Sequence, residues 1–531
     1  MIQNETVGSD KILKEKRAEA LHKLDNAKFG WFHIKACLVS GIGFFTDAYD
    51  LFIINLAMLM MGCVYFKDAP GHEKNRVPVY IDTLVKASGQ IGTLIGQLLF
   101  GILADHLGRK RMYGVELMII IVSTCASALS ASTVSGLSVF AVLAIWRIFL
   151  GLGIGGDYPL SATITSEFAS TKRRGAMMAA VFAMQGFGIL AASLVAIALL
   201  ACFKNAVNAN QDNLDYVWRL CIGFGAIPGL ISIYFRMTIP ETPRYTIDVD
   251  DDIERAINDV DEITEGHKHK LENHHEAGNK ASFKDFCRHF SQWKNLKILL
   301  GTSVSWFALD VGFYGINLNT GIIIEAIGFS GNIETDPWNC LFKDAIGNLI
   351  IALMGLVPGY WFTVFLVDKM GRKTIQIIGF VALTVLLLVL GIAYNQIKNF
   401  SIALFIVIFT LMQFFQNFGP NTTTFIIPGE VFPTRYRSTA HGISAAAGKL
   451  GAIVSQVGFF QLKDIGGKNK SIPTILIIFG GFMFIGLLFT LLLPETKGKS
   501  LEELAGEVET QKENEDNSNG REVYENKIES F

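Results

Sequence analysis

Four ionisable residues lie inside long apolar runs of the sequence. Asp47 and Asp50 fall within 34–65, Asp157 lies in a Gly-rich apolar run, and Lys449 lies in a third run. An ionised side chain at bilayer depth costs about 3 kcal/mol or more, so such a residue is a candidate for function. Three acids within helices predict a pathway for an ion, and the lysine indicates that the cargo is an anion.

The composition indicates a membrane protein. The chain has 531 residues, of which 50% are hydrophobic and 18% are charged, and its mean hydropathy is +0.38. A formal net charge of -2 leaves no basic surplus for binding nucleic acid. The seven cysteines are scattered, with neither zinc-ligand nor disulfide-framework spacing. We therefore predict no metal and no cofactor, and expect the lipid bilayer as a partner.

Apolar windows of about 20 residues, the length of a membrane-spanning helix, recur along the chain. The twelve predicted spans are 34–63, 82–104, 113–132, 137–167, 176–202, 217–238, 297–327, 342–367, 374–395, 401–428, 438–461 and 473–493. They predict an all-α membrane protein with two pseudo-symmetric six-helix bundles. The predicted divisions are a segment 1–33, a bundle 34–238, a central loop 239–295, a bundle 296–494 and a tail 495–531.

The polar segments carry less structural signal. The first 33 residues lack the apolar stretch of a signal peptide, so the first span is expected to be retained. The central loop and the tail are rich in charge, and we expect both to be poorly folded, the tail largely disordered.

Basic residues predict the orientation of the spans. Lys and Arg gather in alternate connections, at Arg109-Lys110-Arg111, Lys172-Arg173-Arg174, Lys369 with Arg372-Lys373, and Arg435 with Arg437. Because short cytoplasmic loops are enriched in these residues, we expect these connections and both termini to be cytoplasmic. Glycosylation sequons at Asn399 and Asn469 then lie on the outer side, and the sequence leaves open whether they are used.

The two halves of the chain repeat each other. Asp105 followed by Gly-Arg-Lys returns as Asp368 followed by Gly-Arg-Lys, 263 residues later. The same offset separates Glu167 from Glu430, and Arg174 from Arg437. A repeat of six-helix halves is typical of secondary transporters, whose substrate site lies between the halves near the membrane midplane.

The loop motifs resemble those of the major facilitator superfamily. The run from Gly101 to Arg111 matches the superfamily's signature loop, and Pro-Glu-Thr at 240–242 and 494–496 resembles the sugar-porter branch. The resemblance implies gating and structural roles for the charges at the ends of the helices. These residues are Asp105, Arg109, Glu167, Arg174, Asp368, Arg372, Glu430 and Arg437, together with Arg147 from a motif tied to proton coupling.

Three further motifs resemble the phosphate:proton symporters of fungi and plants. They are Gly-Gly-Asp-Tyr-Pro-Leu-Ser-Ala-Thr at 155–163, Gly-Phe-Phe-Thr-Asp-Ala-Tyr-Asp at 43–50 and Gln-Asn-Phe-Gly-Pro-Asn-Thr-Thr-Thr at 416–424. The resemblance covers about residues 30–505 and fits the fungal high-affinity type. It implies a multi-pass protein, in a plasma membrane, that imports inorganic phosphate with protons by alternating access.

The resemblance also implies which residues bind the substrate. The phosphate ligands would be Asp157, Tyr158, Gln185, Trp306, Asp310, Tyr314, Asn421 and Lys449. The proton pathway would use Asp47, Asp50, Asp157 and Asp310. Trp306, Asp310 and Tyr314 recur every four residues and so share one helix face. The offset of 263 also relates Asp47 to Asp310.

These residue types suit a coupled anion site. Lys449 can neutralise phosphate as a compact cation. A protonated Asp310 can donate a hydrogen bond to a phosphate oxygen, whereas an ionised one repels the anion. Proton and phosphate then improve each other's binding, which is thermodynamic coupling. Arsenate has nearly the same shape and is expected to compete.

Other functions remain open at this point. A sugar:proton symporter shares the branch motifs, although a buried lysine has no evident partner on a sugar. A phosphate receptor that signals with little flux is a further alternative, although the loop and tail are short for an effector domain. An enzyme is disfavoured because the chain shows no phosphate-binding P-loop and no nucleophile–base pair.

Overall fold

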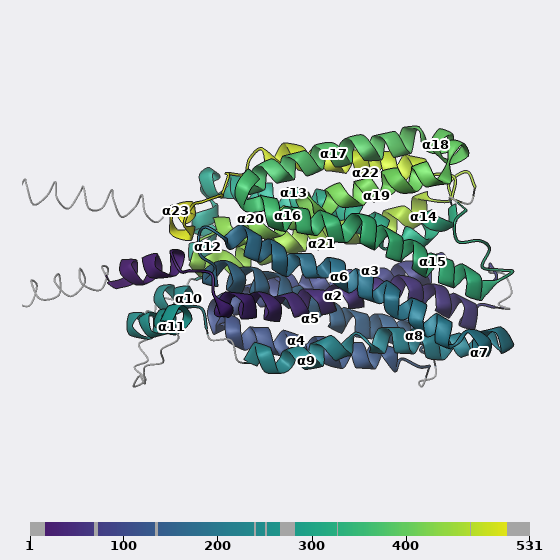
Figure 1. Ribbon diagram of the computed structural model, residues 1–531, viewed down its shortest axis with the longest axis horizontal. Coiled ribbons are helices and arrows are strands. Elements are labelled where there is room, and N and C mark those ends of the chain that lie inside the picture. The colour runs from purple at the N-terminus through teal and green to yellow at the C-terminus, as the bar shows by residue number, and fades with distance from the viewer. Residues whose placement is uncertain are drawn as a thin grey trace, which may run out of the picture.

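The computed structural model describes residues 16–67, 73–132, 136–237, 241–249, 252–265, 282–326, 328–467 and 469–506. Within these residues every regular element is a helix, and 12 helices are long and apolar enough to cross a membrane. The prediction of twelve spans is confirmed, because apolar length alone determines which segments can span. The helices lie side by side in one elongated bundle (Figure 1).

The first half contributes six spans. Its helices are α2 (Trp31–Tyr65), α3 (Val79–Leu107), α4 (Arg109–Ala128), α5 (Val139–Phe168), α6 (Arg174–Cys202), and the pair α8 (Leu214–Gly223) and α9 (Ala226–Met237). The short α7 (Lys204–Ala209) and a 3-10 turn at Gln211–Asn213 precede α8.

The second half repeats this arrangement. Its helices are α13 (Trp293–Asn317), α15 (Pro337–Ile351) with α16 (Val357–Met370), α17 (Arg372–Ile392), α19 (Ile402–Asn417) with α20 (Pro420–Val431), α21 (Arg437–Leu462) and α22 (Ile472–Thr490). A π-helical turn at Ala352–Leu356 joins α15 to α16. The short α14 (Thr320–Ala326) and α18 (Tyr394–Phe400) lie at the end where α7 lies (Figure 1).

Several predicted spans are broken into two helices. The predicted span 297–327 ends at Asn317, and its remainder forms α14. The span 401–428 is interrupted before Pro420, which has no N–H for the preceding turn. The span 217–238 is interrupted at Gly225, where a Cβ would collide with the carboxylate of Asp50. A hydropathy window averages over such breaks, so the apolar pattern does not reveal them.

The central loop and the C-terminal segment are partly helical. The described residues include α10 (Pro243–Asp248), α11 (Ile253–Glu265), α12 (Phe283–Phe290) and α23 (Leu501–Ala505), which gather at one end of the bundle (Figure 1). The prediction of a poorly folded loop is therefore wrong for these segments. On α11, Ala256 and Val260 are buried against clusters that include Ala20 and Leu24 of the N-terminal segment. The expected disordered tail beyond 506 lies outside the described residues.

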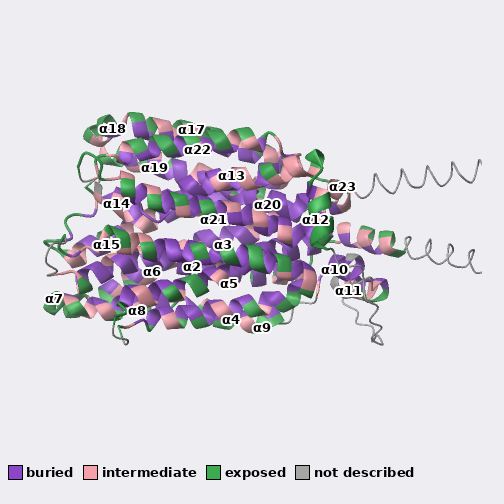
Figure 2. Ribbon diagram, turned by 180° about the vertical axis from the view of Figure 1, so that it is seen from behind, coloured by how far each residue is buried: buried purple, intermediate pink, exposed green. Residues whose placement is uncertain are grey.

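Small residues allow the helices to approach closely. A Cβ on Gly92 of α3 would meet the backbone carbonyl of Ile148 on α5, and one on Gly155 of α5 would meet that of Thr93. Such contacts are typical of helix packing in membranes. Apolar side chains on the outward faces of peripheral helices such as α17 and α9 are exposed, and buried residues fill the centre (Figure 2). The exposed faces suit contact with lipid.

Candidate functional site

A buried lysine lies at the centre of the bundle. The Nζ atom of Lys449, on α21, donates to Asp310 Oδ2 at 2.9 Å and to the hydroxyl of Tyr314 at 2.9 Å, both on α13. Lys449 is 1% exposed and Asp310 is 1% exposed. Removing one partner of such a pair would leave an unpaired buried charge.

Aromatic and amide side chains from the first half complete this site. Lys449 Nζ lies 4.9 Å from the ring centroid of Tyr158 on α5. Gln185 Nε2 on α6 lies 3.5 Å from the Tyr158 hydroxyl. Trp306 packs against Tyr158 with ring centroids 6.3 Å apart. The site therefore lies between the two halves and draws ligands from both.

Asn421 lies beside the site but bonds to other groups. Its Nδ2 atom donates to the hydroxyl of Tyr360 on α16 at 2.7 Å and to Asn417 Oδ1 at 2.8 Å. The ring of Tyr360 packs on Phe182, with centroids 6.1 Å apart. Tyr360 could not be predicted as part of the site, because one tyrosine among apolar residues gives no distinguishing signal.

Asp157 belongs to a second charged cluster. Its carboxylate accepts from Arg236 Nη2 at 2.6 Å and from Ser161 Oγ at 2.5 Å, and no contact of the described residues joins it to Lys449. The prediction that Asp157 contacts phosphate stays a prediction, while its observed bonds join it to Arg236 and Ser161. Successive residues of a helix point about 100° apart, so neighbours in sequence serve different sites.

The second cluster contains more acids than bases. Arg236 on α9 also donates to Glu116 on α4. Asp47 on α2 interacts electrostatically with Asp157, Arg236 and Glu116. Both carboxylate oxygens of Asp47 are buried with no hydrogen-bond partner among the described residues. Glu116 and Arg236 were missed, although each is charged within or at the end of an apolar run, the signal that found Lys449.

Asp50 and Arg147 lie together on the neighbouring side of α2. Asp50 Oδ2 accepts from Thr124 Oγ1 at 2.7 Å. Arg147 Nη1 on α5 donates to the backbone carbonyl of Asp50 at 3.0 Å. Arg147 is therefore not part of the contacts that close the end of the bundle, where sequence analysis grouped it with the gating charges.

Two carboxylates close the end of the bundle where α10 lies, which we name the α10 end. Asp105 of α3 accepts from Thr439 N and Thr439 Oγ1 at 2.7 Å each, and from Ser438 N at 3.3 Å, in the first turn of α21. Asp368 of α16 accepts from Ala176 N at 2.9 Å, in the first turn of α6. Each acid thus meets the positive end of a helix in the opposite half.

Buried arginines that bond to carboxylates and backbone carbonyls support both contacts. Glu167 accepts from Arg437 Nη1 at 2.8 Å, and Arg109 donates to the carbonyl of Thr434 at 2.8 Å, so both pairs cross between halves. In the second half, Arg372 donates to Glu430 at 2.7 Å. Arg174 donates to the carbonyl of Lys499 at 3.0 Å.

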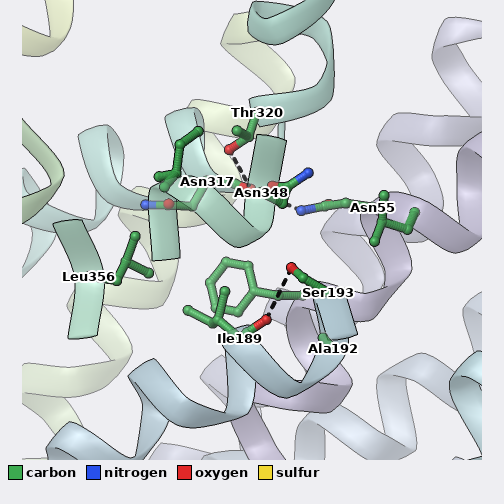
Figure 3. A pocket seen from close by; sticks show the side chains of 11 residues that line it. Asn55, Ile189, Ala192, Ser193, Asn317, Thr320, Asn348 and Leu356 are labelled. Atoms are coloured by element: carbon green, nitrogen blue, oxygen red, sulfur yellow. Dashed lines mark hydrogen bonds between the residues drawn. The ribbon is translucent and has the colours of Figure 1, made fainter. Parts of the chain in front are cut away.

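The opposite end, named the α7 end, has a vestibule of about 420 Å³ between the halves. Its lining includes Asn55, Lys86 and Phe460. A smaller cavity of about 20 Å³, the size of a water site, shares Asn55 and Asn348 with the vestibule (Figure 3).

Two contacts separate this smaller cavity from Lys449. Asn55 Nδ2 donates to the backbone carbonyl of Asn317 at 2.9 Å and so joins α2 to α13 (Figure 3). The ring of Phe52, which lines the cavity, stacks on Tyr314 with centroids 5.9 Å apart and planes at 5°. The structure is therefore closed at the α10 end, and toward the α7 end the Phe52 ring lies between the small cavity and Tyr314 of the site.

A sequence model of the family described as "Sugar (and other) transporter" matches residues 36–507. The chain belongs to this family. Its fold is that of the major facilitator superfamily: a proton:xylose symporter superposes with a TM-score of 0.69 at 19% identity, covering 90% of this chain and 98% of that one. At that identity the likeness shows the fold alone.

Curated relatives within the family are more similar. A repressible high-affinity phosphate permease of Neurospora crassa is 47% identical, with 94% of this chain and 91% of the relative covered. The inorganic phosphate transporter PHO84 of Saccharomyces cerevisiae is 46% identical, with 92% and 87% covered. An inorganic phosphate transporter 1-6 of rice, Oryza sativa subsp. japonica, is 42% identical.

This member of the transporter family carries an additional ion-pair group outside its spans. Arg244 on α10 donates to Glu502 on α23 at 2.9 Å and to Asp25 at 2.8 Å. Burial alone would raise the pKa of Glu502, but the Arg244 guanidinium outweighs it and lowers the pKa to about 2.

Among the described residues no group of three or more His, Cys, Asp or Glu is arranged to hold a metal ion.

Proposed function

We propose that this protein is a proton-coupled importer of inorganic phosphate that works by alternating access. The observation that carries the proposal is the buried Lys449–Asp310 pair of the second half, which bonds to Tyr314 and faces Tyr158 of the first half. A cation at that depth suits an anionic cargo. Relatives 47% and 46% identical are named as phosphate permease and phosphate transporter, which supports phosphate as that anion.

The Lys449–Asp310 pair supplies the coupling. With Asp310 ionised, the lysine's charge is already neutralised and the carboxylate repels phosphate. A proton on Asp310 frees Lys449 to neutralise phosphate and turns the acid into a hydrogen-bond donor. Phosphate binding and protonation therefore favour each other, and either one alone leaves an uncompensated charge in a buried site. The remaining proposed phosphate ligands are Tyr158, Gln185, Trp306, Tyr314 and Asn421.

The acid-rich cluster around Arg236 gives the proton a second station. Three carboxylates, those of Asp47, Glu116 and Asp157, share one guanidinium. Like charges so close together in a buried site repel one another, so a proton on one of the three carboxylates relieves that repulsion. We assign Asp47, Asp50 and Asp157 to the proton route, and Asp157 to this role in preference to direct contact with phosphate.

Alternating access follows from the contacts at the two ends. Opening the α10 end requires Asp105 and Asp368 to leave the helix termini that they cap. The α7 end opens when Phe52 leaves Tyr314 and Asn55 leaves Asn317. We propose that the α10 end and both termini face the cytoplasm of a plasma membrane, in agreement with the basic residues of that end.

Uptake into proteoliposomes tests the proposal. Radiolabelled phosphate should accumulate when an inward proton gradient is imposed, and a protonophore should abolish accumulation. Arsenate should compete, and labelled xylose or glucose should not accumulate. Lys449→Met should abolish uptake at unchanged insertion. Hexose accumulation without phosphate uptake would refute the proposal and favour a sugar symporter, whereas saturable phosphate binding without flux would favour a receptor.

A further inference from the structure

A buried amide on α3 has no bonding partner. Gln90 is 0% exposed, and neither its Oε1 nor its Nε2 has a hydrogen-bond partner among the described residues. Buried side-chain amides are nearly always bonded, because an unpaired polar group in a dry interior is costly. An unpaired amide is therefore a candidate for bonding to a group that arrives during function, and its position in the bundle decides whether a substrate can reach it.

The alignment of α3 against α21 shows which part of α21 lies opposite Gln90. The two helices run antiparallel, and close contacts fix their alignment. A Cβ on Gly101 would meet the carbonyl of Ser438. A Cβ on Gly442 would meet the carbonyl of Gln97. Each step of four residues along one helix is thus matched by four residues along the other.

Two turns further toward the α7 end, the same register reaches Gln90 and Lys449. Gln90 is seven residues from Gln97, and Lys449 is seven residues from Gly442. Seven residues rise about 10 Å in each helix and return to nearly the same face. Gln90 therefore lies at the level of Lys449, on the face of α3 that is turned to α21.

The vestibule begins one helical turn from Gln90 in the direction of the α7 end. Lys86, four residues earlier on the same face of α3, lines the vestibule. Its Nζ lies 5.3 Å from the ring centroid of Phe460 on α21. Gln90 is thus placed at the level of the central site and one turn from the vestibule, on the route that a substrate from the α7 end would follow.

We propose that Gln90 is a further phosphate-contacting residue, contributed by the first half opposite Lys449; this rests on the proposed function. The Nε2 group donates to a phosphate oxygen, and Oε1 accepts from a phosphate hydroxyl. At neutral pH phosphate carries one or two protons, whereas sulfate carries none. The amide carbonyl therefore favours phosphate, because sulfate would leave that acceptor unpaired.

Equilibrium binding of radiolabelled phosphate to the full-length protein in nanodiscs tests this assignment. Gln90→Met keeps the size of the side chain and removes its bonds, and should weaken phosphate binding about tenfold. The ratio of the sulfate Kd to the phosphate Kd, from competition, should fall. Gln97→Met is the matched control: it removes an equally buried, unpaired amide at the level where the helix backbones meet, and should change the Kd less than about twofold.

Other outcomes separate the possibilities. Wild-type affinity in Gln90→Met, or an equal loss in Gln97→Met, would overturn the assignment. If Gln90→Met does not fold, Gln90→Glu provides the test, because it keeps the shape. Its phosphate Kd should be weakened at pH 7.5 and recover toward wild type as the pH is lowered, and a pH-independent wild-type Kd would overturn the assignment. Absence of phosphate binding in the wild type would refute the proposed function instead.

Discussion

The contact between Asp105 and the first turn of α21 makes a quantitative prediction. Asp105→Asn keeps the shape of the side chain, and its carbonyl can still accept from Thr439 N and Oγ1, which lie 2.7 Å from one carboxylate oxygen. The NH2 group of the asparagine then takes the position of the other carboxylate oxygen, which accepts from Ser438 N. Two donors face each other there, so this hydrogen bond is lost. The full charge at the helix terminus and beside Arg109 is also lost.

These losses together amount to about 2 kcal/mol, from the weaker helix-terminal interaction and the loss of charge-assisted bonds. The equilibrium should therefore shift roughly 30-fold toward opening of the α10 end. Asp368→Asn is the symmetry-related control. Asp368 also has an arginine beside it, Arg372 of its own half at 2.9 Å, but among the described residues it accepts only one hydrogen bond from the opposite half, from Ala176 N at 2.9 Å. Its shift should therefore be smaller, roughly fivefold.

Spin labels across the α10 end measure this shift. Positions 110 and 435 are exposed and lie on opposite halves, so their distance distribution reports opening. The exposed Cys125, Cys202 and Cys287 would first be replaced by serine. A longer-distance population should grow more in Asp105→Asn than in Asp368→Asn. An unchanged distribution in Asp105→Asn, or a larger shift in Asp368→Asn, would refute the reasoning.

Three further predictions concern the site, its cover and the loop contacts. Lys449→Met should abolish saturable phosphate binding in an equilibrium assay, and retained affinity would contradict the lysine's role. Phe52→Ala removes the ring that stacks on Tyr314. Phosphate association measured by stopped flow should become roughly twofold to thirteenfold faster, which corresponds to the about 0.5–1.5 kcal/mol of a ring pair; an unchanged rate would count against a gate there. The pKa of Glu502 is lowered from 4.5 to about 2, because the Arg244 guanidinium outweighs the effect of burial. The Glu502–Arg244 ion pair therefore stabilises the docked α23 above pH 4.5. This stabilisation is lost as the pH falls toward 2. Hydrogen exchange of α23 should rise in that window, and already at pH 7 in Glu502→Gln; full protection at pH 2 would contradict this.

The spans and the repeat are predictable from the sequence because each depends on local information. Apolar length determines whether a segment crosses a bilayer, and the 263-residue offset is visible in the loops. The charges at 105 and 368 follow from that offset, and both cap helix termini in the opposite half. The four-residue spacing of Asp310 and Tyr314 likewise places both on one face of α13.

Other features depend on packing that no local pattern records. Asp157 was predicted to contact phosphate, yet its helix face turns it toward Arg236, a residue 79 positions away. The break at Gly225 follows from the position of Asp50, which a hydropathy window cannot detect. Gln90 stands out only after burial and bonding are known, since a glutamine in an apolar run has no charge to draw notice.

The measurement that tests the central claim most directly compares two kinds of phosphate flux in Asp310→Asn. The amide mimics a permanently protonated acid, so exchange of phosphate between equal concentrations on the two sides should continue and lose the part of its pH dependence that protonation of Asp310 imposes. Accumulation driven by a proton gradient should be lost, because no proton is bound and released at this position. Gradient-driven accumulation at wild-type levels in this variant would contradict coupling through the Lys449–Asp310 pair.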